Sequence, residues 1–367
     1  MQGSLPTKPR LHRSYHIISD PESDEIQLHS EGRAVRLQPV TPPDLLKRLV
    51  PLLDGTHTVD EVKNMMRGFD EARVADSLQL LYEARLLEDA AHSTTSLSKA
   101  QEDLYASQLA FFSHFTDEPY KFQATLLRSE VAVIGLGDLG RTLVSSLADN
   151  GTGRLAGIEI AEGPSADADL VHGQLQQQCA TKSPWTTYEA ITLRSDTPSQ
   201  IEAAVGGAEL LIAALDSPAP DLLDHINTAC IQADIPWTPV GLQATEGFVG
   251  PTVLPRQTAC YKCYELRTKG NLKHYKQYLL YEEHLRTTPN RRSYGALPQF
   301  KRLMADLAAT EAAKVLTHFC PPTTIGRVLN LDFLTQETDY HEVLKLPRCP
   351  TCGDPSRQLP MMNPWTT

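Results

Sequence analysis

The feature that most constrains the fold is the stretch VAVIGLGDLGRTLVSSLADNG, which runs from Val131 to Gly151. An apolar strand leads directly into the spacing G-x-G-x-x-G, and a helix follows. The first glycine permits a tight turn, the second lets the backbone approach a phosphate, and the third allows close packing of the helix. Unpaired N–H groups at the start of the helix then face an anion. The glycines are Gly135, Gly137 and Gly140. The pattern predicts a nucleotide-binding ancestry, and the alternative is that the glycines only close a turn.

The strand after such a turn usually carries an acidic residue for the ribose hydroxyls, about 20 residues further on. The segment GIEIAE offers Glu159 first and Glu162 second. Glu159 has the better spacing, so we predict that it belongs to the cofactor-binding set. The alternative is an ordinary solvated carboxylate at a strand end.

Strands alternate with helices over most of the chain beyond residue 130. The apolar segments VAVIG, GRLAGIEIA, ELLIAAL and IPWTPVGL are separated by helical patterns. This alternation predicts an α/β domain over 91–367 with a largely parallel, Rossmann-like sheet and crossover helices. A long amphipathic helix over 300–319 and a return to strands complete the domain.

The first quarter of the chain has a different pattern. Three short strand patterns, SYHIIS, EIQLHS and RAVRLQPV, are followed by three helical patterns, the second with Thr58 as its cap. This order predicts a small winged-helix-like α+β domain over 14–90. Residues 1–13 are polar and basic, which predicts a flexible tail. The polar segment AHSTTSLSK after residue 90 predicts a hinge.

Charge and hydropathy exclude several classes of protein. The chain has 367 residues and a formal net charge of −11, which disfavours nucleic acid as the main partner because phosphate binding needs a basic surface. No apolar run approaches the roughly 18 residues of a membrane span, and the N-terminus lacks a signal-peptide pattern. We therefore expect a cytoplasmic protein with no membrane partner.

Four of the seven cysteines form two C-x-x-C pairs. They are Cys260, Cys263, Cys349 and Cys352. Two such pairs suit a tetrahedral zinc ion with no open position, so we predict a structural zinc site. A redox dithiol is the alternative, but neither pair stands in a thioredoxin-like unit. Cys179, Cys230 and Cys320 stand alone and are interpreted as packing residues or idle thiols.

Two stretches beyond the glycine turn resemble a known family. The segments LIAALDSPAPDLLDHINTACIQADIPWTPVGL and GPTVLPRQTACYKCYELR resemble the ubiquitin-activating-like family of the ThiF/MoeB type. That family has an aspartate after a strand, and Asp216 falls at this position. Pro236 falls at the strand that ends in the family's substrate cleft, and Gly250 falls in the segment before the first cysteine pair. The resemblance covers about Tyr105 to Gly353.

A narrower resemblance involves the N-terminal module, the helix PQFKRLMADLAATEAAKVLT and the closing LPRCPTCG. Together they resemble the ThiF-like, leader-peptide-binding partner of azol(in)e peptide cyclodehydratases. The resemblance implies that the module binds the leader of a ribosomal precursor peptide as an added strand beside GRAVRLQ, with the third helix as the other wall. A plain winged helix without a peptide is the alternative. The implied peptide-binding residues are Arg33, Ala34, Val35, Arg36, Leu37, Val74, Leu78 and Leu81.

The sequence departs from the adenylating members of the wider family at two places. Ser107 in YASQ stands where those members have an arginine, and ADLVHGQL lacks the second arginine. Lys182 and Asp216 are implied matches for the family's lysine and its magnesium-associated aspartate, and Arg141 is a weak substitute for a lost cation. Because phosphoryl chemistry needs such cations, we expect adenylation with ATP to be absent or strongly impaired. We also expect the nucleotide site to be vestigial.

The resulting hypothesis is a binding protein. It presents the leader to a separate YcaO-type cyclodehydratase, which forms thiazoline or oxazoline rings, and it stimulates that enzyme. The first alternative is an ATP-dependent adenylating enzyme that uses Asp216 and Lys182. A second is an enzyme that activates a sulfur carrier; hydride transfer is disfavoured because no catalytic histidine or Tyr–Lys pair is evident. Related scaffolds dimerise, so a homodimer is among the expected assemblies.

Overall fold

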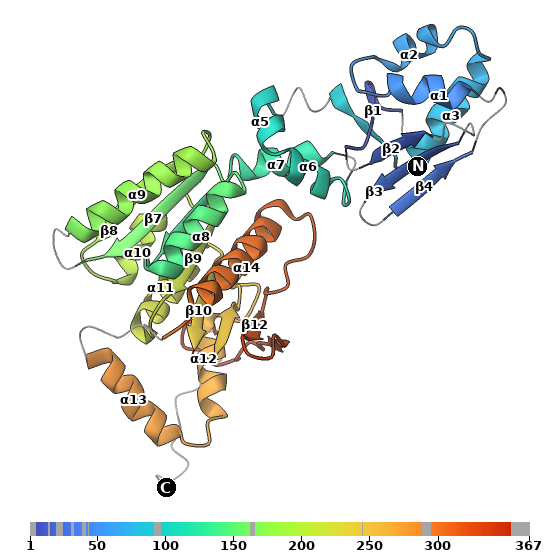
Figure 1. Cartoon of the computed structure of the whole chain (residues 1–367). Coiled ribbons are helices and arrows are strands. Elements are labelled where there is room, and N and C mark those ends of the chain that lie inside the picture. The colour runs from blue at the N-terminus through green and yellow to red at the C-terminus, as the bar shows by residue number, and fades with distance from the viewer. Residues whose placement is uncertain are drawn as a thin grey trace. The chain divides into compact units, whose positions relative to one another are not determined.

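The computed structural model describes most of the chain in two compact units. The units comprise residues 1–125 and 126–367, and each is considered by itself below (Figure 1). Among the described residues, no helix combines the length and apolar character that crossing a membrane requires. The described residues are 5–13, 15–19, 25–30, 33–38, 42, 44–91, 97–116, 118–161, 166–243, 245–287 and 295–353.

The first unit contains a three-stranded antiparallel sheet in the order β2-β3-β4. Its strands are β2 (His16–Ser19), β3 (Ile26–Ser30) and β4 (Arg33–Leu37). Ile26 and Leu28 alternate with polar residues along β3 and are buried, which places one face of the sheet against the core. The three predicted strands are therefore present, and β4 forms an edge of this sheet.

Helices cover the buried face of this sheet. Thr58 caps α2 with a capping box: it accepts a hydrogen bond from the backbone of Glu61, whose side chain accepts one from the Thr58 N–H. Leu45, Leu78 and Val62 come from three different helices and share one core with β3. The helices are α1 (Leu45–Leu49), the 3-10 helix η1 (Val50–Leu52), α2 (Val59–Met65) and α3 (Glu71–Glu83).

The prediction of a flexible tail over 1–13 is wrong for the residues that form β1 (Pro9–Leu11). This strand pairs antiparallel with β5 (Leu87–Asp89), and Leu11 is buried. The basic character of the segment suggested solvent exposure, but Arg10 Nε lies 2.6 Å from Oε1 of the buried Glu88. The charge is therefore compensated inside the unit.

The predicted domain boundary after residue 90 also differs from the structure, which divides the chain at 125/126. Two further helices lie before that division, α5 (Lys99–Leu104) and α6 (Ala106–Phe112), and a third, α7 (Pro119–Leu126), ends at it. Arg13 Nη2 lies 2.9 Å from Glu102 Oε2 on α5, and the Tyr120 hydroxyl donates to Glu88 at 3.4 Å. These contacts join α5 and α7 to the first unit, and the polar stretch before them gave no signal of this.

The second unit is built on an eight-stranded sheet in the order β13-β12-β11-β10-β9-β6-β7-β8. The five strands from β10 to β8 are mutually parallel, and β11, β12 and β13 follow with antiparallel pairing between neighbours. The α/β class with a largely parallel sheet is thus confirmed. The strands are β6 (Glu130–Ile134), β7 (Arg154–Ile160), β8 (Thr187–Leu193), β9 (Leu210–Leu215), β10 (Trp237–Gln243), β11 (Glu246–Val249), β12 (Arg327–Asp332) and β13 (Thr338–Glu342).

Helices cover both faces of this sheet. One layer contains α8, α9 and α14, and the other contains α10 and α11 (Figure 1). Every residue of β9 is buried, as expected for a strand covered on both faces. The strand order reverses between β6 and β9, and ligands of open α/β sheets bind at the carboxyl ends of the strands beside such a reversal. The helices are α8 (Asp138–Asp149), α9 (Ala166–Lys182), α10 (Pro198–Val205), α11 (Pro220–Ala233), α12 (Tyr261–Gly270), α13 (Tyr275–Thr287) and α14 (Pro298–Thr317).

A buried carboxylate ties α14 to the segment before β12. Glu311 is 4% exposed, and its Oε2 accepts hydrogen bonds from the backbone N–H of Thr323 at 2.7 Å and of Thr324 at 2.9 Å. Lys314 Nζ lies 2.6 Å from Oε1. Burial alone would raise the pKa of Glu311, but the bonds from Lys314, Thr323 and Thr324 outweigh it and lower the pKa.

We expect Glu311→Gln to lower the free energy of unfolding of the second unit by about 3 kcal/mol, because it breaks a buried ion pair. Glu337→Gln, at an exposed position, is the matched control and should have little effect. Because the folded pKa of Glu311 is lowered, its contribution is present above the unfolded pKa of about 4.3 and is lost as the pH falls through the folded pKa. Thermal unfolding at pH 7 and pH 3.5 tests this, and equal losses in the two variants would contradict it.

Candidate functional site

The glycine turn between β6 and α8 is fixed by close contacts. Gly135 has a φ of +91°, and a Cβ there would lie 2.3 Å from the carbonyl oxygen of Ala214. A Cβ at Gly140 would lie 1.8 Å from the carbonyl oxygen of Gly135. Neither position has room for a side chain, so the first and third glycines serve the tight turn and the close helix packing.

The second glycine lies beside the aspartate that follows β9. A Cβ at Gly137 would be 2.2 Å from Oδ2 of Asp216, and the backbone N–H of Leu139 donates to this oxygen at 3.1 Å. The first turn of α8 favours a negative charge there. Asp216 therefore accepts one of the N–H groups that such a turn offers to an anion.

A lysine that the sequence analysis missed reaches the same point. Lys301, near the start of α14, places Nζ 2.9 Å from Asp216 Oδ1 and 2.9 Å from Asp138 Oδ2. Its hydrogen bond, followed by that of Arg141, lowers the pKa of Asp138. Burial alone would lower the pKa of Lys301, but the two carboxylates raise it, so the side chain is charged near neutral pH. The periodic pattern of the helix gave no signal for this contact.

Glu159 is placed at the turn, as the spacing predicted. Its Oε2 accepts a hydrogen bond from the N–H of Leu136 at 3.0 Å, and burial raises its pKa. Glu162 lies outside the described residues. A cavity of about 340 Å³ opens beside Glu159. It is lined by Leu136, Gly137, Arg141, Glu159, Ile160, Ala161, Asp167, Ala168, Val171 and His172.

His172 also lines this cavity. Its Nδ1 lies 2.8 Å from the hydroxyl of Tyr188, and its buried Nε2 has no hydrogen-bond partner among the described residues. Burial lowers the pKa of His172, which keeps the ring neutral near pH 7. Gly157 makes the arrangement fit, because a Cβ there would lie 2.0 Å from the Tyr188 hydroxyl.

The adenylating alternative requires Lys182 to lie near Asp216. The structure does not bring these two residues together. Lys182 ends α9 and forms an ion pair with Asp149, the last residue of α8. Asp216 contacts Leu139 in the first turn of the same helix. At a rise of 1.5 Å per residue, the two ends of α8 are separated by roughly 16 Å. The lysine and the aspartate therefore do not share one catalytic site.

The four cysteines of the two C-x-x-C pairs converge on one point. The Sγ of Cys260 lies 3.9 Å from that of Cys263 and 3.6 Å from that of Cys349, and Cys263 lies 3.5 Å from Cys352. All four sulfurs are within 4.8 Å of one another. A tetrahedron with metal–sulfur bonds of about 2.3 Å has edges of about 3.8 Å, so the donor set fits a metal ion. Leu346 also donates its N–H to Cys263 Sγ at 3.3 Å.

The remaining cysteines are separate from this cluster. Cys179 and Cys230 are buried, and burial raises the pKa of both thiols, that of Cys179 to about 11. They are therefore protonated near neutral pH, which agrees with their interpretation as packing residues. Cys320 is half-buried.

A comparison with known protein families finds a match in the C-terminal part of the chain. The model of the ThiF family matches residues 175–353. The chain carries a ThiF family domain. Residues 1–174, which include the glycine turn, lie outside the matched range.

Two curated relatives support this assignment at low identity. The sulfur carrier protein ThiS adenylyltransferase of Escherichia coli strain K12 is 25% identical over 249 residues, which is 63% of this chain and 88% of that protein. The vegetative HesA protein of Trichormus variabilis is 25% identical over 257 residues, 65% of this chain and 86% of that protein.

Solved structures share the fold over nearly the whole chain. Escherichia coli MccB, crystallised with MccA-N7isoASN, has a TM-score of 0.65 at 16% identity and covers 94% of this chain and 99% of its own. The heterocyclase TruD has a TM-score of 0.64 at 21% identity and covers 95% of this chain. This chain spans only 43% of TruD. At these identities the likeness concerns the fold.

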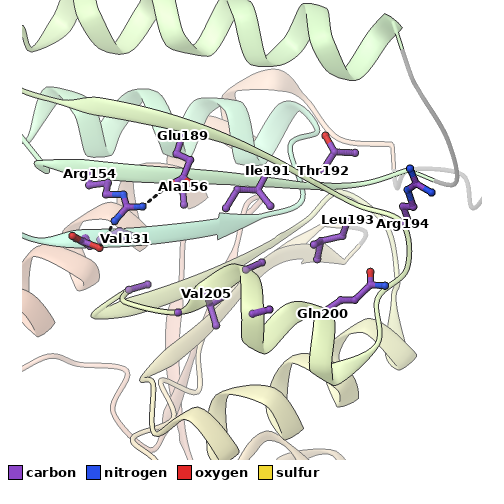
Figure 2. Close-up of a pocket in the computed structure, with 15 residues that line it drawn as sticks. Val131, Arg154, Ala156, Glu189, Ile191, Thr192, Leu193, Arg194, Gln200 and Val205 are labelled. Atoms are coloured by element: carbon purple, nitrogen blue, oxygen red, sulfur yellow. Dashed lines mark hydrogen bonds and ion pairs between the residues drawn. The ribbon is translucent and has the colours of Figure 1, made fainter.

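The second unit also has a hollow of about 500 Å³ beside strand β8. Figure 2 shows Arg154 at one end of the hollow, Arg194 at the other, and apolar side chains such as Ile191 and Val205 between them. Arg154 is held in ion pairs with Glu130 and Glu189. Because these two carboxylates neutralise the charge of Arg154, we assign no ligand-binding or catalytic role to this hollow.

In the N-terminal unit, only some of the predicted peptide-binding residues are accessible. On β4, Ala34 and Arg36 are exposed, while Val35 and Leu37 are half-buried; the side chain of Arg33 lies outside the described part of the chain. The prediction is wrong for three residues of α3, whose side chains are at most 4% exposed. They pack into the core against Ile26 and Leu28 because they form the apolar stripe of the helix. These three are Val74, Leu78 and Leu81.

We expect the purified chain to carry about one metal ion, measured by plasma mass spectrometry, because the four thiolates fit a closed tetrahedral site. Cys260→Ser should lose the ion and lower the melting temperature, since metal binding and folding are coupled. Cys320→Ser, which lies outside the cluster, should keep both. A metal-free wild-type protein, prepared without chelators and as stable as a zinc-treated sample, would contradict the site.

Proposed function

We propose that the chain binds the leader of a ribosomally made precursor peptide through its N-terminal unit. It would present that peptide to a separate YcaO-type cyclodehydratase, which forms thiazoline or oxazoline rings, and stimulate it. Two fold neighbours support a role in peptide modification: MccB has been crystallised with MccA and its derivative, and TruD is a heterocyclase. The chemistry would be carried out by the partner enzyme.

The observation that carries this proposal is the edge of β4. Among the described residues, β4 pairs with β3 along one side only. The backbone groups of its other side are available to an incoming strand, and strand addition at such an edge is a common mode of peptide recognition. We infer that this winged-helix-like unit accepts the leader as a fourth strand.

The outward face of α3 is the second wall in this proposal. With the apolar stripe of the helix committed to the core, an exposed residue must provide the contact. Leu80 is 63% exposed on α3, although it is large and apolar. An exposed apolar side chain on this helix suits a pocket for one leader side chain.

The ThiF family domain is proposed not to adenylate. The two arginines of adenylating relatives are absent from YASQ and ADLVHGQL, and Lys182 is paired with Asp149 away from the glycine turn. Losing cations that stabilise charge in the transition state costs several kcal/mol. We propose that the domain instead serves as a scaffold. The metal of the four-cysteine cluster is proposed to be a structural zinc ion. Formation of a homodimer stays a prediction.

The second candidate function is ATP-dependent adenylation of a precursor peptide. It is favoured by the cavity beside Glu159 and by the fold of MccB, which has been crystallised with ATP. The two functions give different products when the chain alone is incubated with precursor peptide, ATP and magnesium. Release of AMP and pyrophosphate would support adenylation, whereas leader binding without nucleotide turnover would support the scaffold.

We expect synthetic fluorescein-labelled leader peptides, taken from short reading frames beside the gene, to bind the full-length chain in an anisotropy titration. Leu80→Asp should weaken binding about 10-fold, or about 1.4 kcal/mol, because it places a charge in the proposed apolar wall. Leu334→Asp is the control, since Leu334 is 72% exposed in the other unit. Equal affinity for all three proteins would contradict the assignment of α3, and no binding by wild type would contradict the proposed function.

A further inference from the structure

We propose that Lys301 is the fixed cation of the glycine-turn site and that it excludes a divalent metal ion from Asp216. The inference extends the proposal that this domain does not adenylate. It concerns a residue outside the glycine motif, on the helix α14. The resemblance implied a magnesium-associated role for Asp216, and the surroundings of this carboxylate do not fit that role.

Both oxygens of Asp216 already have donors. Lys301 Nζ lies 2.9 Å from Oδ1, and the N–H of Leu139 lies 3.1 Å from Oδ2. The side chains of Lys301 and Asp216 are 13% and 18% exposed, so solvent has limited access to the pair. The same ammonium lies 2.9 Å from Asp138 Oδ2. One lysine is thus paired with both Asp216 and Asp138.

A magnesium ion would need the same oxygens. It requires oxygen ligands at about 2.1 Å in an octahedral arrangement. An ion bonded to Asp216 Oδ1 would lie within a few ångströms of the ammonium, and the two positive charges would repel each other at short range. The metal could therefore bind only after Lys301 had left both carboxylates.

The position of the ammonium is set by helix packing. Lys301 stands on α14, which packs along α8, and the hydroxyl of Ser146 on α8 donates to Asp306 on α14 at 2.6 Å. Gly137 lets the Asp216 carboxylate approach the turn closely. Because the site is built from two packed helices and a tight turn, the backbone of Lys301 is held beside the turn by helix packing and not by a loop.

The test measures binding of Mn²⁺ to the full-length chain by electron paramagnetic resonance, with Mn²⁺ as a probe for a magnesium-type oxygen site. Wild type should show no occupancy at this site below millimolar Mn²⁺. Lys301→Met should gain a site that binds at least 10-fold more tightly, and the double variant K301M/D216N should lose that gain. Lys301→Arg keeps the charge and should resemble wild type.

Arg302→Met is the matched control. Arg302 is the next residue on α14, is exposed, and lines a surface pocket together with Lys301 and Asp138. It removes one positive charge but should gain no Mn²⁺ site. A similar gain in K301M and R302M, or a site in wild type as tight as in K301M, would overturn the proposal. Should K301M fail to fold, Lys301→Gln provides the same comparison. These outcomes are independent of leader binding and of pyrophosphate release, which test the proposed function.

Discussion

Close backbone contact between the glycine turn and the neighbouring strand end determines how the second unit is assembled. Three positions without side chains let α8 start directly against the ends of β6 and β9, with hypothetical Cβ atoms overlapping Ala214, Asp216 and the turn itself. This approach fixes α8 on the sheet, and α14 packs on α8. The position of Lys301 and the surroundings of Asp216 follow from that stack of helices. Close packing of this kind leaves little freedom to rearrange the site.

The turn and the cysteine cluster could be predicted from the sequence because both depend on local spacing. G-x-G-x-x-G between a strand and a helix specifies a backbone path, and Glu159 follows from the regular length of one β-α-β unit. Two C-x-x-C pairs specify four donors, so their convergence required only that the fold join them. The strand and helix periodicities likewise specified the class of each unit.

Features that depend on contacts distant in sequence could not be found in this way. Lys301 is separated from Asp138 by 163 positions, and nothing in its helix pattern distinguishes it from a solvated lysine. Strand β1 forms only because it pairs with β5, about 78 positions further along the chain, where the buried Glu88 also neutralises Arg10. Val74, Leu78 and Leu81 of α3 were assigned to the peptide wall, but they belong to the core of the first unit. A side chain that fills the core cannot also face a ligand.

The cysteine cluster has a consequence for the stability of the chain's last part. Its two pairs are 89 positions apart, and the chain between them contains α12, α13, α14, β12 and β13. An ion bound by all four sulfurs would close this long loop and restrict the unfolded ensemble, much as a crosslink does. Metal supply would then determine how readily the antiparallel end of the sheet detaches and becomes open to proteolysis.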